Sequence, residues 1–184
     1  AILPVRYEIT NTGATASSST MKQICSTVIS EGGYQQVSAP LVARRTTPYA
    51  TLGTSFVPLV SIRLASDALG AVVLPHQINV LPTSAGDYEI VLVKNATLTG
   101  ASYDTTTFQN VDYDVTATAM TGGTIVSTQY ATASNQSASA IQAQDGYNFD
   151  LQLGASLAGV SDVYTVGVRV LSGTGDAIGS LAFY

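Results

Sequence analysis

Residues 86–95, GDYEIVLVKN, form the clearest β-strand pattern in the chain and guide the interpretation of the rest. The stretch is rich in valine, isoleucine and tyrosine, which fit a pleated, half-buried surface. Ala85, Gly86 and Asp87 place a turn signal at its start. The same signature recurs outward on both sides, so we predict further strands at residues 2–9, 23–30, 56–65, 70–82, 110–120, 124–131, 147–155, 162–172 and 180–184.

The segments between these strands carry turn and loop signals. Gly122 and Gly123 predict a tight hairpin turn into residues 124–131. Residues 173–179, GTGDAIG, predict a turn before the last strand. A short helical turn at residues 21–24 competes with the strand at 23–30. Residues 131–146 are polar and small, which indicates either a long loop or a short surface helix.

Residues 34–54 contain Pro40, Arg44, Arg45 and Pro48. We predict an irregular or edge segment here that contacts a neighbouring subunit, because proline is confined to the edges and irregular positions of sheets. Arg44 and Arg45 are the only adjacent basic pair, and an acidic group across a subunit boundary would pair with them. Together with Tyr49 they are the candidate interface residues.

About nine short strands, with turn signals between them and no alternation of strands and helices, predict an all-β fold with little helix. We expect a single antiparallel β-sandwich or jelly roll over residues 1–184, because this length suits one domain. The chain starts and stops on strand-like residues. We interpret Ala1 as following a removed methionine, or the chain as a section of a longer polypeptide, or its ends as held by partner subunits.

Charge is sparse, because only 10% of residues are charged and the net charge is −5. Seven basic residues are too few to neutralise the phosphates of duplex nucleic acid, so we expect no nucleic-acid partner. No apolar run approaches the roughly 18 residues of a membrane-spanning helix, so we expect no membrane partner. The single cysteine, Cys25, forms no internal disulfide and fits a reducing compartment.

Residues that catalyse reactions or bind metals lack the partners they need in this sequence. His76 is the only histidine and has no second ligand at metal-binding spacing, so we expect a surface or structural residue. Cys25 has only that imidazole to activate it, so we expect a small buried hydrophobic residue. We therefore predict no catalytic, cofactor-binding or metal-binding residues, and no enzyme activity.

Two acidic clusters need separate consideration. Asp112 and Asp114 lie on one face of a predicted strand, where paired carboxylates could serve glycoside hydrolysis or bind calcium. The chain has no tryptophan for a substrate platform, and calcium loops place their ligands in turns rather than in mid-strand. We predict that both carboxylates lie on a solvated strand face, and we interpret Asp145, Asn148 and Asp150 in the same way.

Several segments together resemble a family of tailed-bacteriophage virion structural proteins that is widespread in phages of aquatic bacteria. These segments are LPVRYEITNTG (residues 3–13), MKQICSTVISEGGY (21–34), VSIRL (60–64), DYEIVLVKNATLTGASY (87–103), NVDYDVTATAMTGGTIV (110–126) and FDLQLGASLAGVSDVYTVGVRVLSG (149–173). The resemblance covers nearly the whole chain and rests on string similarity rather than on a catalytic motif. Longer members of the family carry an N-terminal part that this chain lacks.

The resemblance implies a non-enzymatic domain that acts through protein–protein contacts, as a capsid decoration or cement protein or as another component of the particle surface. It implies a location in the virion after synthesis in the host cytoplasm. The expected partners are other virion proteins, such as the major capsid protein, and further copies of the chain in a trimer or dimer. Sparse charge suits closely apposed subunits, because little charge must be desolvated. No cofactor is implied.

Two alternative functions stay open at this point. A tail-fibre or receptor-binding module that recognises a host-surface glycan would expose a tyrosine platform, for which the candidates are Tyr103, Tyr113, Tyr130 and Tyr147. A hydrolase would instead place the carboxyls of Asp112 and Asp114 across a cleft, and it would lose turnover in Asp114→Asn.

Overall fold

The computed structural model describes residues 39–134, 141–142, 151–156 and 158–184. The chain divides into two compact units, Ala1–Val37 and Ser38–Tyr184, and every described residue belongs to the second. The strands predicted at residues 2–9 and 23–30, and the burial predicted for Cys25, lie outside the described residues. So do the acidic cluster of residues 145–150 and the candidate platform residue Tyr147.

The described part of the chain is built almost entirely from strands. Twelve strands occur there: β1 (Leu41–Arg44), β2 (Tyr49–Leu52), β3 (Val57–Leu64), β4 (Pro75–Pro82), β5 (Gly86–Lys94), β6 (Thr97–Thr99), β7 (Val111–Asp114), β8 (Ala119–Thr121), β9 (Thr124–Ala133), β10 (Ile141–Gln142), β11 (Val163–Val170) and β12 (Gly175–Phe183).

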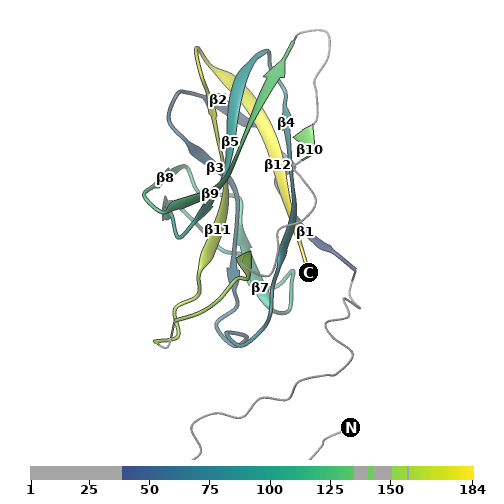
Figure 1. Ribbon diagram of the computed structural model, residues 1–184, viewed down its shortest axis with the longest axis vertical. Helices are drawn as coiled ribbons and strands as arrows, with labels where there is room; N and C mark the ends of the chain where they lie inside the picture. The colour runs from purple at the N-terminus through teal and green to yellow at the C-terminus, as the bar shows by residue number, and fades with distance from the viewer. Residues whose placement is uncertain (1–38, 135–140, 143–150, 157) are drawn as a thin grey trace, which may run out of the picture. The chain divides into compact units, whose positions relative to one another are not determined.

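The strands form two five-stranded antiparallel sheets and one two-stranded sheet. Sheet A has the order β1-β12-β4-β10, and β2 pairs with β12 on the same side as β1. Sheet B has the order β7-β3-β11-β5-β9, and β6 pairs with β8. Figure 1 shows the two large sheets as the layers of a sandwich, with β4 and β12 in one and β5 and β11 in the other.

The strand order of these two sheets is that of a jelly roll. β1 and β2 count here as one interrupted edge strand, and eight strands then follow in chain order: β1/β2, β3, β4, β5, β9, β10, β11 and β12. Their sheet orders become 1-8-3-6 and 2-7-4-5. The predicted all-β sandwich of jelly-roll type is therefore confirmed. β6, β7 and β8 lie between β5 and β9 along the chain and are additional to the eight strands of the jelly roll.

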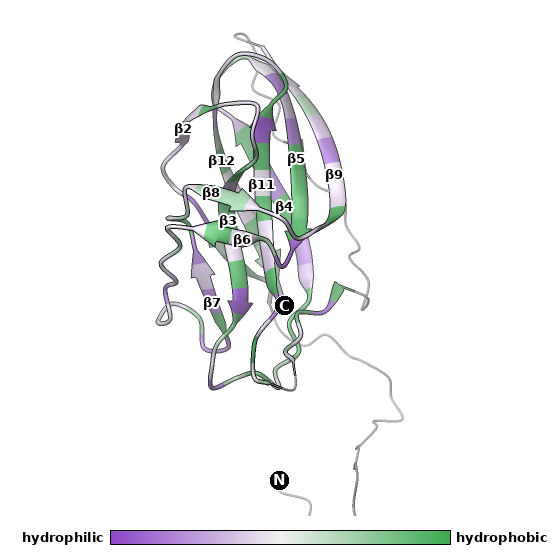
Figure 2. Ribbon diagram, turned by 90° about the vertical axis from the view of Figure 1, so that its left-hand side faces the viewer, coloured by the Kyte–Doolittle hydropathy of each residue, from purple (hydrophilic) through white to green (hydrophobic). Residues whose placement is uncertain are grey.

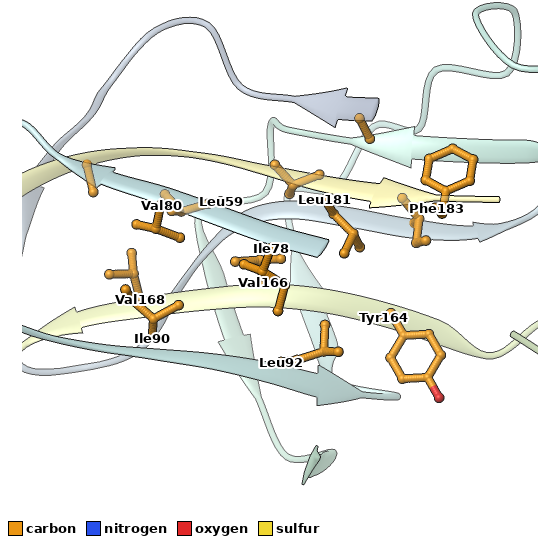
Figure 3. Packing of buried hydrophobic residues seen from close by; sticks show 14 of the residues in the cluster. Leu59, Ile78, Val80, Ile90, Leu92, Tyr164, Val166, Val168, Leu181 and Phe183 are labelled. Atoms are coloured by element: carbon orange, nitrogen blue, oxygen red, sulfur yellow. The ribbon is translucent and has the colours of Figure 1, made fainter. Parts of the chain in front are cut away.

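Aliphatic and aromatic side chains from both sheets fill the space between the layers. Figure 3 shows Ile78, Val80 and Leu181 from sheet A facing Ile90 and Val166 from sheet B. Alternate residues of each strand point inward, so the period-2 pattern of the sequence supplies the buried face. Removal of these side chains from water is the main favourable term for folding.

β5 is buried on both of its faces. Inward residues of β5 join the main core, whereas Val91 and Val93 form a second cluster with Leu98 of β6 and Met120 of β8. Figure 2 shows β6 and β8 lying across the outer side of sheet B. Because both faces of β5 are covered, the run Ile90 to Val93 is continuously apolar rather than alternating.

The predicted hairpin turn at Gly122 and Gly123 is wrong. β8 ends at Thr121 and β9 begins at Thr124, but β8 pairs with β6 and β9 pairs with β5, so the two glycines carry the chain from one sheet to another. Both glycines have a positive φ, 66° and 77°. A Cβ on Gly123 would also lie 2.7 Å from Lys94 O, so the position requires glycine for two reasons.

Four other predicted segments also differ from the structure. The strand predicted at residues 110–120 is split into β7 and β8, and the turn predicted at 173–179 is largely strand, because β12 begins at Gly175. Within the described part of the strand predicted at 147–155, residues 151–155 form only isolated bridges, such as Val73 with Leu153. The loop or helix predicted at 131–146 contains the end of β9 and the short strand β10.

Residues 34–54, predicted as an irregular or edge segment, include β1 and β2. Both strands pair with β12 and lie at the margin of sheet A, which agrees with the edge position. Residues 45–48 interrupt the edge between them, and Pro48 lacks the N–H that a continuous strand would need. The contact predicted for this segment with a neighbouring subunit stays a prediction.

Candidate functional site

Asp112 is buried rather than solvated, contrary to the prediction. Its exposed fraction is 3%, and Arg63 binds Oδ2 through Nε at 3.1 Å and Nη2 at 3.0 Å. The register of β3 and β7 places the two residues directly opposite one another. Tyr103 covers the ion pair, with its ring centroid 4.0 Å from Arg63 Cζ. Burial raises the pKa of Tyr103 to about 12, against the opposing effect of the Arg63 charge.

Asp114 is also buried, with an exposed fraction of 2%, so the solvated-face prediction is wrong for both carboxylates. Its Oδ1 accepts hydrogen bonds from Ser102 N at 2.8 Å and from Thr116 N at 3.0 Å, and its Oδ2 accepts one from Ala117 N at 3.0 Å. The carboxylate therefore ends β7 and organises the loop before β8. Because structural donors occupy these oxygens, this geometry does not favour the hydrolase alternative.

Glu89 is a third buried carboxylate, on the outer side of sheet B. Arg169 lies directly opposite it on β11, and its Nε donates to Oε2 at 2.6 Å. Tyr130 of β9 donates its hydroxyl to Oε1 at 3.3 Å. The Arg169 guanidinium also lies over the Phe56 ring, 4.6 Å from its centroid. This cluster ties β9, β5 and β11 together side by side.

Lys94 and Asp162 form an ion pair at the end of β5, with Nζ 2.9 Å from Oδ2. Burial raises the pKa of Asp162, but hydrogen bonds from Asn95 and Lys94 outweigh it and hold this pKa below its ordinary value. The hydrogen bond to Asp162 raises the pKa of Lys94 above its ordinary value. The stabilisation that Asp162 contributes is therefore fully present above the pKa of the aspartate in the unfolded chain. It is lost as the pH falls through the lower pKa of the aspartate in the folded protein. The stabilisation that Lys94 contributes is fully present below the pKa of the lysine in the unfolded chain. It is lost as the pH rises through the higher pKa of the lysine in the folded protein.

We expect Asp162→Asn to lower the free energy of unfolding at neutral pH by up to about 1 kcal/mol, because the pair is partly solvent-exposed. The difference from the wild type should shrink as the pH falls below about 4, the ordinary pKa of an aspartate, because the unfolded chain binds the proton there and the folded carboxylate binds it only at lower pH. Urea unfolding across this pH range measures it. Asp67→Asn is the control, because Asp67 is exposed and has no hydrogen bond or ion pair in the described residues. A difference that stays constant down to low pH would contradict the expectation.

Arg44 and Arg45 differ from the other described cations. Of the seven basic residues, Arg6 and Lys22 lie outside the described residues, and three of the remaining five are paired with the carboxylates above. Within the described part of the chain, Arg44 and Arg45 form no ion pair. Arg45 instead donates from Nη1 to Val115 O at 2.5 Å and from Nε to Thr47 O at 3.0 Å. Its guanidinium is therefore held in place by neutral carbonyl groups.

Two grooves meet at this arginine pair. The first, which we call the β1 groove, has a volume of about 460 Å³ and is lined by Val42, Arg44, Arg45, Thr46, Thr47, Thr107, Phe108, Tyr113 and Val115. The second has a volume of about 370 Å³ and lies on sheet A, where Asn79, Leu81, Ile178 and Ser180 line it beside both arginines. No carboxylate from the described residues lines either groove.

The β1 groove lies between the edges of the two sheets. Val42 and Arg44 come from β1 at the margin of sheet A, whereas Tyr113 comes from β7 at the margin of sheet B. Phe108 packs edge-on against Tyr113, with ring centroids 5.4 Å apart, and against Phe183 of the core at 5.3 Å. The groove therefore has an aromatic wall fixed to the core and a basic rim.

The structure brings together some of the candidate residues and separates others. Arg44, Arg45 and Tyr113, which came from different arguments, line one groove. Tyr49 lies beside it, with its ring centroid 4.9 Å from Arg45 Cζ and its hydroxyl 3.1 Å from Thr118 O. Tyr130 is 67% exposed but belongs to β9, at the opposite edge of sheet B from Tyr113, so these two cannot share one platform.

Sequence reasoning missed Thr107, Phe108 and Val115 as groove residues. Nothing in their local pattern marks them, because they come from the segments on either side of β7, far from β1 along the chain. Thr107 also donates its hydroxyl to Asp104, as Thr106 does. Hydrogen bonds from the Thr106 backbone and from both threonine hydroxyls lower the pKa of Asp104 to about 2.

The described residues provide neither a metal-binding cluster nor a membrane-spanning helix. No group of three histidine, cysteine, aspartate or glutamate side chains in the described ranges is placed to bind a metal. His76 is half-buried against Tyr184, with ring centroids 4.8 Å apart. No helix in the described residues is long and apolar enough to span a membrane. Comparisons of the chain with protein-family models, with curated proteins and with solved structures found no match.

Proposed function

We propose that the chain is a non-enzymatic structural protein of a tailed-bacteriophage particle that acts through protein–protein contacts. Capsid decoration or cementing is the role we favour, at the particle surface. The proposal starts from the resemblance of the quoted segments to virion structural proteins. It places the protein in the virion after synthesis in the host cytoplasm.

One structural observation supports this proposal most: the buried carboxylates serve the fold. Asp112 and Glu89 are each bound by an arginine, and Asp114 is bound by backbone amides and a threonine hydroxyl. A general acid or base needs a free oxygen within reach of a substrate proton. The arginine and lysine side chains that form no ion pair in the described residues are instead two arginines at a sheet edge, where a partner can reach them.

The jelly-roll strand order is compatible with this role. Jelly rolls are found in viral capsid proteins and in lectins, so the architecture suits particle assembly and carbohydrate recognition alike. Because one fold hosts many functions, this support is an analogy at the level of architecture. The surface chemistry at β1 therefore supports the proposal more strongly than the fold does.

The proposed partners are other virion proteins, including the major capsid protein, and further copies of the chain in a trimer or dimer. Low charge lowers the desolvation cost of bringing such surfaces together. The net charge of −5 gives no reason to include nucleic acid among the partners.

Mass spectrometry of purified particles from a phage that encodes this sequence tests the proposal. We expect the chain at a fixed stoichiometry to the major capsid protein, and we expect cryo-electron microscopy to place a jelly roll on the particle surface. Light scattering of the purified chain should show a trimer or dimer. Absence of the chain from purified particles would refute the virion role.

A second candidate function is recognition of a host-surface glycan by a tail-fibre or receptor-binding module. The observation that favours it is the β1 groove, in which Phe108 and Tyr113 form an aromatic wall beside threonine hydroxyls and two arginines. Such a combination suits a sugar ring with an acidic substituent. A glycan array with the full chain separates the candidates: sugar binding that is lost in Tyr113→Ala would favour the adhesion role.

A further inference from the structure

We propose that β1 accepts an extended, carboxylate-bearing segment of a different protein as an added strand, with its acidic side chains at Arg44 and Arg45. This inference deepens the proposed function, on which it rests, by naming the chemistry of the partner. It depends on three observations at β1: the direction of its backbone groups, its unpaired charge and its exposed apolar residues.

Among the described residues, no strand pairs with the side of β1 that faces away from β12. β1 pairs with β12 and is the last strand of sheet A in the described residues. Arg45 N donates to Gly179 O at 2.9 Å, and the register continues from there through Arg44 opposite Ser180. Because hydrogen-bonded and non-bonded positions alternate in an antiparallel pair, the N–H and C=O groups of Val42 and Arg44 point away from β12. These are the groups that a further strand would bind.

The charge at this edge selects the partner. Within the part of the chain that the structure describes, Arg44 and Arg45 form no ion pair and no carboxylate lines the grooves on either side of them. Both arginines line the two grooves, and carboxylates match the hydrogen-bonding geometry of a guanidinium group. A second copy of β1 would bring four arginines together, so the charge argues for a different, acidic chain.

The apolar residues of β1 provide the remaining contact. Leu41 is 47% exposed and Val42 is 45% exposed, although both belong to a strand. The β1 groove beside Val42, about 460 Å³ with its wall of Phe108 and Tyr113, has room for alternate side chains of an added strand. Figure 1 shows β1 at the margin of its sheet, beside β12.

Edge strands are also protected by shortness and by proline, and β1 has four residues between Pro40 and Pro48. Protection against unwanted strand pairing is enough to explain the shortness of β1 and its flanking prolines. It does not require two uncompensated arginines beside a groove with an aromatic wall, since a single exposed charge is enough to discourage pairing.

Selection of a displayed library of random twelve-residue peptides on the full chain tests the proposal. We expect enrichment of peptides in which aspartate or glutamate alternates with β-branched or aromatic residues. Arg44→Glu should weaken binding of the selected peptides by about tenfold or more, because it replaces an attractive charge with a repulsive one. Val42→Pro should weaken it to a similar extent, because it removes an outward N–H without breaking a bond to β12.

Matched controls separate binding from folding. Arg44→Lys retains the charge and should retain most of the affinity, and all three variants should keep the wild-type melting temperature, since their side chains are exposed. No acidic enrichment, or affinities that Arg44→Glu and Val42→Pro leave unchanged, would overturn the proposal. So would a photo-crosslinker at Val42 that, without peptide, attaches to the chain's own residues 1–37 or to a second copy.

The peptide test and the particle test can fail separately, so failure of the β1 proposal is distinguishable from failure of the virion role. Selective binding of acidic strands by a chain that is absent from phage particles would leave the β1 assignment intact and remove the proposed function. A chain that is present in phage particles but does not select acidic peptides would leave the proposed function intact and remove the β1 assignment.

Discussion

Gly175→Val is expected to lower the free energy of unfolding by about 3 kcal/mol, an overpacking cost at the upper end of the usual range. Gly175 is buried at the start of β12, where a Cβ would lie 2.9 Å from both Tyr88 Cζ and Val170 Cγ2. The Tyr88 ring cannot move aside easily, because its hydroxyl is held by Ser84 O at 2.8 Å and Ser84 Oγ at 2.8 Å. Urea unfolding of the two proteins gives the difference directly.

Two further variants test the cause. Gly70→Val should change stability by less than about 0.5 kcal/mol, because nothing lies within 4 Å of a Cβ at that exposed position. Tyr88→Phe should recover part of the cost of Gly175→Ala in a double-mutant cycle, since the tyrosine hydroxyl is among the atoms that the new Cβ would meet. Wild-type stability in Gly175→Val would show that β12 does not pack on Tyr88 as described.

Asp114→Ala is expected to lower the free energy of unfolding by about 3 kcal/mol, because it leaves several buried donors without an acceptor. The carboxylate binds three backbone amides, those of Ser102, Thr116 and Ala117, and the hydroxyl of Thr116. These bonds join the loop after β6 to the loop after β7. Urea unfolding measures the loss, and faster amide hydrogen exchange at Ser102 and Ala117 would locate it.

Asp114→Asn distinguishes a structural role from a catalytic one. The amide keeps one oxygen for Ser102 and Thr116 but directs its NH₂ group at the Ala117 N–H, so we expect about half of the alanine effect on stability. Asp67→Ala is the control, because Asp67 is exposed. A turnover assay in which Asp114→Asn abolishes activity at unchanged stability would instead support the hydrolase alternative.

Strands with strong local patterns were predicted correctly, and the errors share one physical cause. β3, β5 and β11 follow from their apolar residues alone, because burial on one or both faces of a sheet demands such residues. Asp112 and Asp114 were misplaced because a covered outer face has the same alternating pattern as a solvated one. Tyr103 and the rest of the loop of residues 100–107 cover this face of β7. No local sequence pattern shows that the loop lies against the strand.

The candidate site was predictable only in part. Arg44 and Arg45 stand out in a chain with few charges, and Pro40 and Pro48 mark their segment as an edge. In the described residues these two arginines have no carboxylate partner, whereas Arg63, Lys94 and Arg169 each have one. This difference depends on cross-strand register, which the sequence does not specify.

The amino-acid sequence alone determined the all-β class, the sparse charge and the main strands, because residue type and alternation act over a few neighbouring positions. The tertiary structure decided the jelly-roll order, the burial of the carboxylates and the groove between the edges of the two sheets. Those features come from pairing between segments far apart in the chain, such as β1 with β12 and β3 with β11, and no local pattern encodes such a pairing.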